Sequence, residues 1–154
     1  MILGIDEVGR GAWAGPLVVG ACVWPDNIKL EKLTDSKKLT KKQREKLEPD
    51  LQKLALAFNL GWVAASEIDQ VGLAAALRLA TARAVGQINP KLYDRIIIDG
   101  TVDFLDSPLV TVMKQADLLV PSVSAAANLA KVARDRMMSE LDGQADYAKY
   151  QFAK

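Results

Sequence analysis

Residues 4–11 read Gly-Ile-Asp-Glu-Val-Gly-Arg-Gly and follow directly on three apolar residues at the start of the chain. The pattern predicts a short hydrophobic strand that carries Asp6 and Glu7 into a glycine-rich turn. Carboxylates at the end of a buried strand are costly to desolvate unless cations or hydrogen bonds compensate them. Glycines on both sides of Arg10 let its backbone and guanidinium approach a phosphate or a sugar. Taken alone, an Asp-Glu pair near a glycine-rich turn is more often a solvated turn than a catalytic site; further acids at strand ends would favour chemistry on nucleic acid.

The composition is that of one ordinary globular domain covering residues 1–154, with 50% hydrophobic and 25% charged residues and a formal net charge of +1. The single cysteine, Cys22, excludes an internal disulfide and predicts a reducing, cytoplasmic environment. The sequence shows neither a signal peptide nor a run of about 18 apolar residues, so we expect a soluble protein with no membrane partner. The chain contains no histidine, which excludes Ser-His-Asp triads and histidine-bound zinc.

Hydrophobic patterning along the chain predicts an α/β fold. Five strands are expected, at residues 2–6, 17–24, 54–63, 95–100 and 109–113. Helices are expected from about residue 41, where Thr40 and Gln43 have capping-box spacing, from about 66 through 85, and from 121 to about 140. The first two strands should form a hairpin through the loop at residues 9–15. The resulting architecture is a mixed five-stranded sheet flanked by helices, with its active site at strand ends.

Two further acids follow predicted strands. Asp99 ends an isoleucine-rich strand, and Asp117 lies between the fifth strand and the last helix. Taken singly, Asp99 is typical of a turn and Asp117 of a loop that leads into a helix. Together with Asp6 and Glu7, they predict a shared site. Carboxylates without histidine suit Mg²⁺ or Mn²⁺, and two such ions about 4 Å apart support hydrolysis of a phosphodiester. Because neighbouring strand residues point to opposite faces, Asp6 and Glu7 share a site only if the strand bends or ends at Glu7.

Basic residues gather in the segment from 37 to 46. This cluster is either an exposed, solubilising helix face or a flank that contacts phosphates. Its members are Lys37, Lys38, Lys41, Lys42, Arg44 and Lys46. On the last helix, Lys131, Arg134 and Asp135 have the spacing of local ion pairs.

Four motifs together resemble one known family. Residues 6–11 are similar to the opening motif of ribonuclease HII, the type 2 ribonuclease H family. Residues 35–39 (Asp-Ser-Lys-Lys-Leu), 98–100 (Ile-Asp-Gly) and the helix segment 124–135 resemble its other motifs, in the family's order. Arginine at position 10 favours type HII over the related type HIII, which usually carries lysine there.

The resemblance implies a ribonuclease H fold and a divalent-metal endonuclease. Such an enzyme cuts the RNA strand of RNA–DNA hybrids and incises at ribonucleotides embedded in duplex DNA, leaving a 5′-phosphate and a 3′-hydroxyl, and so serves DNA repair. The resemblance places the metal-binding, catalytic acids at Asp6, Glu7, Asp99 and Asp117. It places recognition of the 2′-hydroxyl at Gly9, Arg10 and Gly11, and contacts to the nucleic-acid backbone at Ser36, Lys37 and Lys38. We expect a monomer that uses Mg²⁺ or Mn²⁺ in a two-metal site.

The C-terminal end departs from the family pattern. Family members usually continue into a His-Lys-Gly-Tyr motif whose tyrosine reads the RNA–DNA junction, whereas this sequence stops at Lys154. We therefore expect that neither Tyr147 nor Tyr150 takes that tyrosine's place. An alternative interpretation is a hybrid-binding module of the same fold with weak or lost turnover. A second alternative is another nuclease or strand transferase on this fold, against which the Gly-Arg-Gly loop argues.

Overall fold

The computed structural model describes residues 1–12, 14–28 and 39–144. At its centre is the predicted mixed five-stranded sheet, in the order β3-β2-β1-β4-β5. The strands are β1 (Ile2–Val8), β2 (Leu17–Val23), β3 (Ala57–Val63), β4 (Arg95–Asp99) and β5 (Val110–Met113). β1 and β2 form the expected antiparallel hairpin, while β4 pairs with β1 in parallel. The N-terminal strand therefore lies in the middle of the sheet, with a hydrogen-bonded neighbour on each side.

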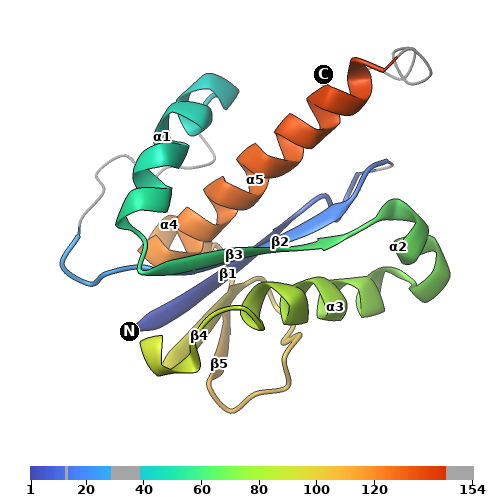
Figure 1. The fold of residues 1–154 in the computed structure, drawn as a ribbon. Coiled ribbons are helices and arrows are strands. Elements are labelled where there is room, and N and C mark those ends of the chain that lie inside the picture. The colour runs from blue at the N-terminus through green and yellow to red at the C-terminus, as the bar shows by residue number, and fades with distance from the viewer. Residues whose placement is uncertain (13, 29–38, 145–154) are drawn as a thin grey trace.

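Helices cover both faces of this sheet (Figure 1). One face carries α1 (Lys41–Leu54), the short α4 (Ala116–Leu119) and the long α5 (Pro121–Asp142). The other face carries α2 (Ala65–Val71) and α3 (Leu73–Val85), and a 3₁₀ turn, η2 (Pro90–Leu92), leads into β4. The predicted capping box begins α1: the Thr40 hydroxyl accepts a hydrogen bond from the Gln43 amide, and the Gln43 side chain accepts one from the Thr40 amide. Within the described ranges, no helix combines the length and the apolar character needed to cross a membrane.

The face toward α3 is closed by aliphatic packing. Side chains from β1, β4 and α3 form one buried cluster that includes Leu3, Ile5, Leu77, Ala80, Ile96 and Ile98. Burying a large aliphatic side chain contributes about 1.5–3 kcal/mol, so this cluster is a main source of the stability of the fold. At Gly61 on β3 a side chain would overlap the backbone of α3, which shows how closely helix and sheet approach.

The opposite face is closed by backbone contact with α5. A side chain at Gly4 would overlap the backbone of Ser122 and Val123, and one at Gly20 would overlap the carbonyl of Ala126. The alanine-rich start of α5 thus lies directly on β1 and β2, because alanine side chains are small enough to let the helix backbone approach the sheet. A second apolar cluster joins α1 to α5 and β2, and comprises Cys22, Trp24, Leu47, Leu51, Ala125, Ala126 and Leu129. Burial there raises the pKa of the Cys22 thiol to about 12.

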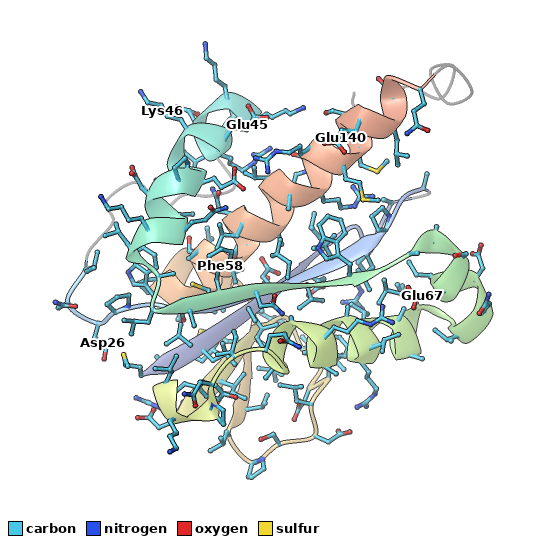
Figure 2. All side chains as sticks on the ribbon, viewed as in Figure 1. Asp26, Glu45, Lys46, Phe58, Glu67 and Glu140 are labelled. Carbon is cyan, nitrogen blue, oxygen red and sulfur yellow. The ribbon has the colours of Figure 1, made fainter. Side chains whose placement is uncertain are left out.

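Three local predictions were inaccurate. The helix expected from about 66 through 85 is divided into α2 and α3 by Gly72, whose φ of 80° lies in the left-handed region. Because α1 runs to Leu54, β3 begins only at Ala57 rather than at residue 54, and as an edge strand it leaves Phe58 36% exposed (Figure 2). The four-residue α4 was not predicted, and it holds one of the candidate acids.

Candidate functional site

Asp6 and Asp99 end up side by side because β1 and β4 run in parallel. The register pairs Ile5 with Ile98, so the next residue along each strand is one of these aspartates. Ile5 and Ile98 both belong to the cluster facing α3. Since successive strand residues alternate between faces, the two aspartates lie on the face covered by α5. The predicted convergence of these two acids at strand ends follows from this register.

Asp117 is brought to the same place by the turn after β5. Gln115 adopts a left-handed conformation (φ 59°) that turns the chain from β5 into α4. The Asp99 carboxylate accepts a hydrogen bond of 2.8 Å from the Ala116 amide, so Asp99 is tied to the residue directly before Asp117. Asp117 itself is only 1% exposed. The sequence predicted its proximity to the sheet end but not the short helix that holds it.

Glu7 reaches the site by a different route from the one predicted. β1 neither ends nor breaks at Glu7, because its pairing with β2 continues to Val8 and Val18. Its pairing with β4, however, stops at Ile5, so Glu7 lies past the last residue of β1 that pairs with β4. Its carboxylate contacts the guanidinium of Arg10 at 3.4 Å. Glu7 therefore links the acids to the glycine-rich loop.

The electrostatics show that the acids influence one another. The pKa of Asp6 rises from 3.8 to about 8, first through burial and then through repulsion from Asp99, Glu7 and Asp117, although the Glu7 amide donates to its carboxylate at 2.7 Å. The pKa of Glu7 is also raised, mainly by burial and further by Asp99, while Arg10 opposes the shift. All four carboxylates thus share one neighbourhood, in which negative charge is poorly compensated.

The donor set in this neighbourhood is oxygen only, which is the chemistry that Mg²⁺ and Mn²⁺ prefer. Among residues 1–12, 14–28 and 39–144, no group of three or more His, Cys, Asp or Glu side chains is arranged so that it could hold a metal ion as it stands. The residue types and their mutual repulsion therefore fit hard divalent cations, but the carboxylates would have to move closer together around them.

The loop between β1 and β2 places Arg10 beside the acids. Gly9 has a left-handed φ of 96°, and its carbonyl accepts a hydrogen bond from the Ala12 amide, which closes a turn around Arg10. Gly11 is exposed, and a side chain added there would meet no protein atom within 4 Å. Gly9 is thus required by the turn, whereas the fold places no such demand on Gly11. Open space at Gly11 is what close approach of a ligand to the backbone would need.

The basic cluster divides into parts with different roles. Ser36, Lys37 and Lys38 lie outside the described residues. Lys46 is exposed on α1 (Figure 2), as are Lys41 and Lys42. Arg44 is instead a structural residue: it donates to the Leu39 carbonyl at 2.6 Å and pairs with Asp135 at 3.4 Å.

One residue near the site was assigned incorrectly from sequence. The predicted local pair between Lys131 and Asp135 is present at 2.6 Å. Arg134, expected to join it, donates instead to the carbonyls of Ala14 and Pro16 in the β1–β2 loop. Helical spacing could not reveal this, since the partners are backbone atoms more than a hundred residues away.

Comparisons with known proteins agree with this geometry. The sequence model of the family described as Ribonuclease HII matches residues 3–153. A Streptomyces coelicolor protein named Ribonuclease HII is 46% identical over 155 residues; the match covers 99% of this chain and 65% of that protein's length. The chain thus spans a little under two thirds of that relative.

Solved structures give the same result for the fold. Ribonuclease HII from Archaeoglobus fulgidus, solved as a complex with PCNA, superposes with a TM-score of 0.78 at 26% identity and covers 100% of this chain and 78% of that one. Ribonuclease H2 from Pyrococcus horikoshii OT3 superposes with a TM-score of 0.74 at 30% identity, and the match covers 99% of this chain and 77% of that one. The fold is therefore ribonuclease H-like, as the motifs predicted.

Proposed function

The chain belongs to the ribonuclease HII family, and we propose that it forms the catalytic domain of a metal-dependent endonuclease acting on RNA–DNA hybrids. The substrates we propose include duplex DNA with single embedded ribonucleotides, cut to leave a 5′-phosphate and a 3′-hydroxyl. The observation that carries this proposal is the convergence of Asp6, Glu7, Asp99 and Asp117 beside the loop that holds Arg10. We further propose that the protein acts as a cytoplasmic monomer in DNA repair.

In this proposal the four acids hold two Mg²⁺ or Mn²⁺ ions. When bound, such a pair activates a water and stabilises the leaving oxygen of an in-line displacement. The protein's own contribution is placement: the parallel register of β1 and β4 sets Asp6 against Asp99, and the Ala116 amide orients the Asp99 carboxylate. Metal binding would also relieve the repulsion that raises the pKa of Asp6.

Arg10 and Gly11 are proposed to read the sugar of the ribonucleotide. The Arg10 side chain is 52% exposed, so a substrate can reach its guanidinium, which lies next to Glu7. The open backbone at Gly11 lets a 2′-hydroxyl, the group that distinguishes RNA from DNA, come within hydrogen-bonding distance of main-chain groups. Lys41, Lys42 and Lys46 would add salt-dependent attraction to the phosphates.

A cleavage assay tests the proposal directly. Duplex DNA carrying one ribonucleotide is incubated with the protein and Mn²⁺ or Mg²⁺, beside an all-DNA duplex of the same sequence. We expect incision on the 5′ side of the ribonucleotide and none in the control duplex. Binding of RNA–DNA hybrid without cutting under either metal would favour a hybrid-binding module, and cutting of the all-DNA duplex would favour a different nuclease on this fold.

The Arg10→Ala variant tests sugar recognition separately. We expect it to bind the ribonucleotide-containing and all-DNA duplexes with more similar affinity while its melting temperature stays within a few degrees of the wild type. If the variant fails to fold, Arg10 is a structural residue and its proposed role in recognition falls.

A further inference from the structure

Arg134 sits in the middle of α5 with its side chain turned into the β1–β2 loop. The residue is 7% exposed. Its Nε donates to the Pro16 carbonyl and its Nη2 to the Ala14 carbonyl, each at 2.9 Å. A guanidinium is a rigid planar fork, so two bonds from different nitrogens fix the position of both carbonyls relative to the helix.

Two glycines make room for this side chain. A side chain at Gly9 would come within 2.7 Å of Arg134 Nε. One at Gly15 would come within 3.3 Å of Arg134 Nη2 and would overlap the sulfur of Met138. Both glycines have left-handed φ angles, 96° and 83°. The β1–β2 loop therefore packs closely against Arg134 near both ends of the loop, at Gly9 and at Gly15. Neither glycine tolerates a larger residue.

The charge of Arg134 depends on these loop contacts. Burial lowers its pKa, and Asp135 is the acid that opposes the shift. Asp135, however, forms ion pairs with Lys131 and Arg44. Among the described residues no acid forms an ion pair with Arg134, and a buried cation needs strong hydrogen bonds in compensation. The Ala14 and Pro16 carbonyls supply two. Displacing the loop would therefore leave a poorly solvated charge inside the protein.

The same helix also sets the position of the acids. Near its start, α5 lies against Gly4 on β1, two residues before Asp6, and its next turns lie against Gly20, the β2 residue paired with Asp6. One rigid element thus contacts both the strand that carries the acids and the loop that carries Arg10.

We propose that Arg134 is a positioning residue for substrate selection: it holds the Gly9–Gly11 turn at a fixed place relative to the acids. Arg134 is buried under the loop, so it acts through Arg10 and Gly11 rather than by touching nucleic acid. This inference rests on the proposed function, because it concerns discrimination between a ribonucleotide and a deoxyribonucleotide. If Arg134 has this role, removing its side chain should reduce discrimination between a ribonucleotide and a deoxyribonucleotide more than it reduces the affinity for divalent metal.

The test uses Arg134→Met, which keeps an unbranched apolar stem at this position but removes the guanidinium and its donors. Arg136→Met is the matched control, since Arg136 lies on the same helix but pairs with Glu48 on α1, away from the loop. For each protein we would measure kcat and KM on the single-ribonucleotide duplex, the ratio of affinities for that duplex and the all-DNA duplex without divalent metal, and the affinity for Mn²⁺ alone.

For Arg134→Met we expect kcat/KM to fall about tenfold to a hundredfold, because displacing a recognition group by about 1 Å has effects of that size. The loss should be mainly in KM, the affinity ratio should approach one, and the affinity for Mn²⁺ should stay within about twofold of the wild type. Arg136→Met should retain the wild-type affinity ratio. A folded Arg134→Met protein that keeps the full affinity ratio overturns the inference.

A second variant covers the case in which Arg134→Met does not fold. Arg134→Lys keeps the charge, but its single ammonium cannot reproduce the two-pronged geometry, so the affinity ratio should again fall. Full retention of the ratio in folded Arg134→Lys overturns the inference as well. A wild-type protein that shows no preference for the ribonucleotide would instead refute the proposed function, and the two failures are thereby distinguishable.

Discussion

β1 and β4 bury very different groups on their two faces. Toward α3 they bury the aliphatic side chains of Leu3, Ile5, Ile96 and Ile98. Toward α5 the same strands present Gly4, Asp6 and Asp99, with helix backbone lying directly on the glycine. The α3 face lowers the free energy of the fold, whereas the α5 face gathers acids that repel one another. A sheet can hold such a cluster because the stabilisation on its other face offsets the repulsion.

The largest expected effect concerns the acid face. Asp99→Asn removes a proposed metal ligand while preserving side-chain shape. Mutating a residue that only orients a metal ligand lowers activity by up to about a hundredfold, so losing the ligand itself should lower cleavage by more than that. The melting temperature should stay the same or rise, because one repelling charge is lost. The control is Asp94→Asn, at the opposite end of β4, where the carboxylate pairs with the N-terminal amine. Activity retained in Asp99→Asn would refute the role of Asp99.

The neighbouring residue tests the aliphatic face. Ile98 is fully buried, so Ile98→Ala should lower the free energy of unfolding by about 2–5 kcal/mol. Chemical denaturation measures this loss, and cleavage per folded molecule should remain near the wild-type value at low temperature. If Ile98→Ala instead stays stable and loses activity, the two faces do not have separate roles.

A weaker effect should appear in the dependence of stability on pH. The pKa of Asp6 is about 8 in the folded protein against an ordinary 3.8. The folded state therefore retains a proton that the unfolded state releases, and without metal the stability should fall as pH rises from about 4 to 8, by at most about 1.4 kcal/mol per pH unit. Thermal melts across this range measure the effect.

Two comparisons identify Asp6 as the source. Asp6→Asn should flatten the pH profile, and Mn²⁺ or Mg²⁺ should restore stability near pH 8. Glu67→Gln is the control, since the bond to Arg83 lowers the pKa of Glu67 to about 2, and its contribution is lost only in acid. A profile that is unchanged in Asp6→Asn would contradict the burial and repulsion assigned to this carboxyl.

The smallest expected change in stability is at Gly11, at the edge of the acid face. Its φ is outside the left-handed region, and a side chain would meet no protein atom. Gly11→Ala should therefore leave stability unchanged or raise it by up to about 1 kcal/mol. If the backbone there approaches the substrate, kcat/KM should still fall about tenfold. Unchanged kcat/KM would remove Gly11 from the proposed recognition site, and Gly9→Ala provides the contrast of a glycine that the turn requires.

Sequence patterns predicted the sheet, and the positions of Asp6 and Asp99 at strand ends, because these depend on local signals. The isoleucine run before Asp99 and the apolar residues before Asp6 are properties of short segments, and they identified both strands. The break at Gly72 was missed because the flanking residues on both sides favour helix, and only the left-handed glycine divides them. The helix α4 was missed because four residues are too few to show a helical period.

Contacts between distant segments were beyond such patterns. Arg134 lies in a group with Lys131 and Asp135 whose spacing predicts local ion pairs, and nothing in its neighbourhood indicates that its partners are the carbonyls of Ala14 and Pro16. The continuation of β1 past Glu7 was equally hidden, because it depends on pairing with Val18. Backbone acceptors and strand register carry no side-chain signature in the sequence.

Arg134 and the Pro16 carbonyl are 118 residues apart in the chain. During synthesis the Gly9–Gly11 turn leaves the ribosome early, while the helix that anchors it is still untranslated. Contacts between such remote segments form late, because closing a long stretch of chain is entropically costly. The β1–β2 loop is therefore among the last parts to be fixed in place, and a nascent chain that already contains Asp6 and Arg10 still lacks the Arg134 anchor that we propose for this loop.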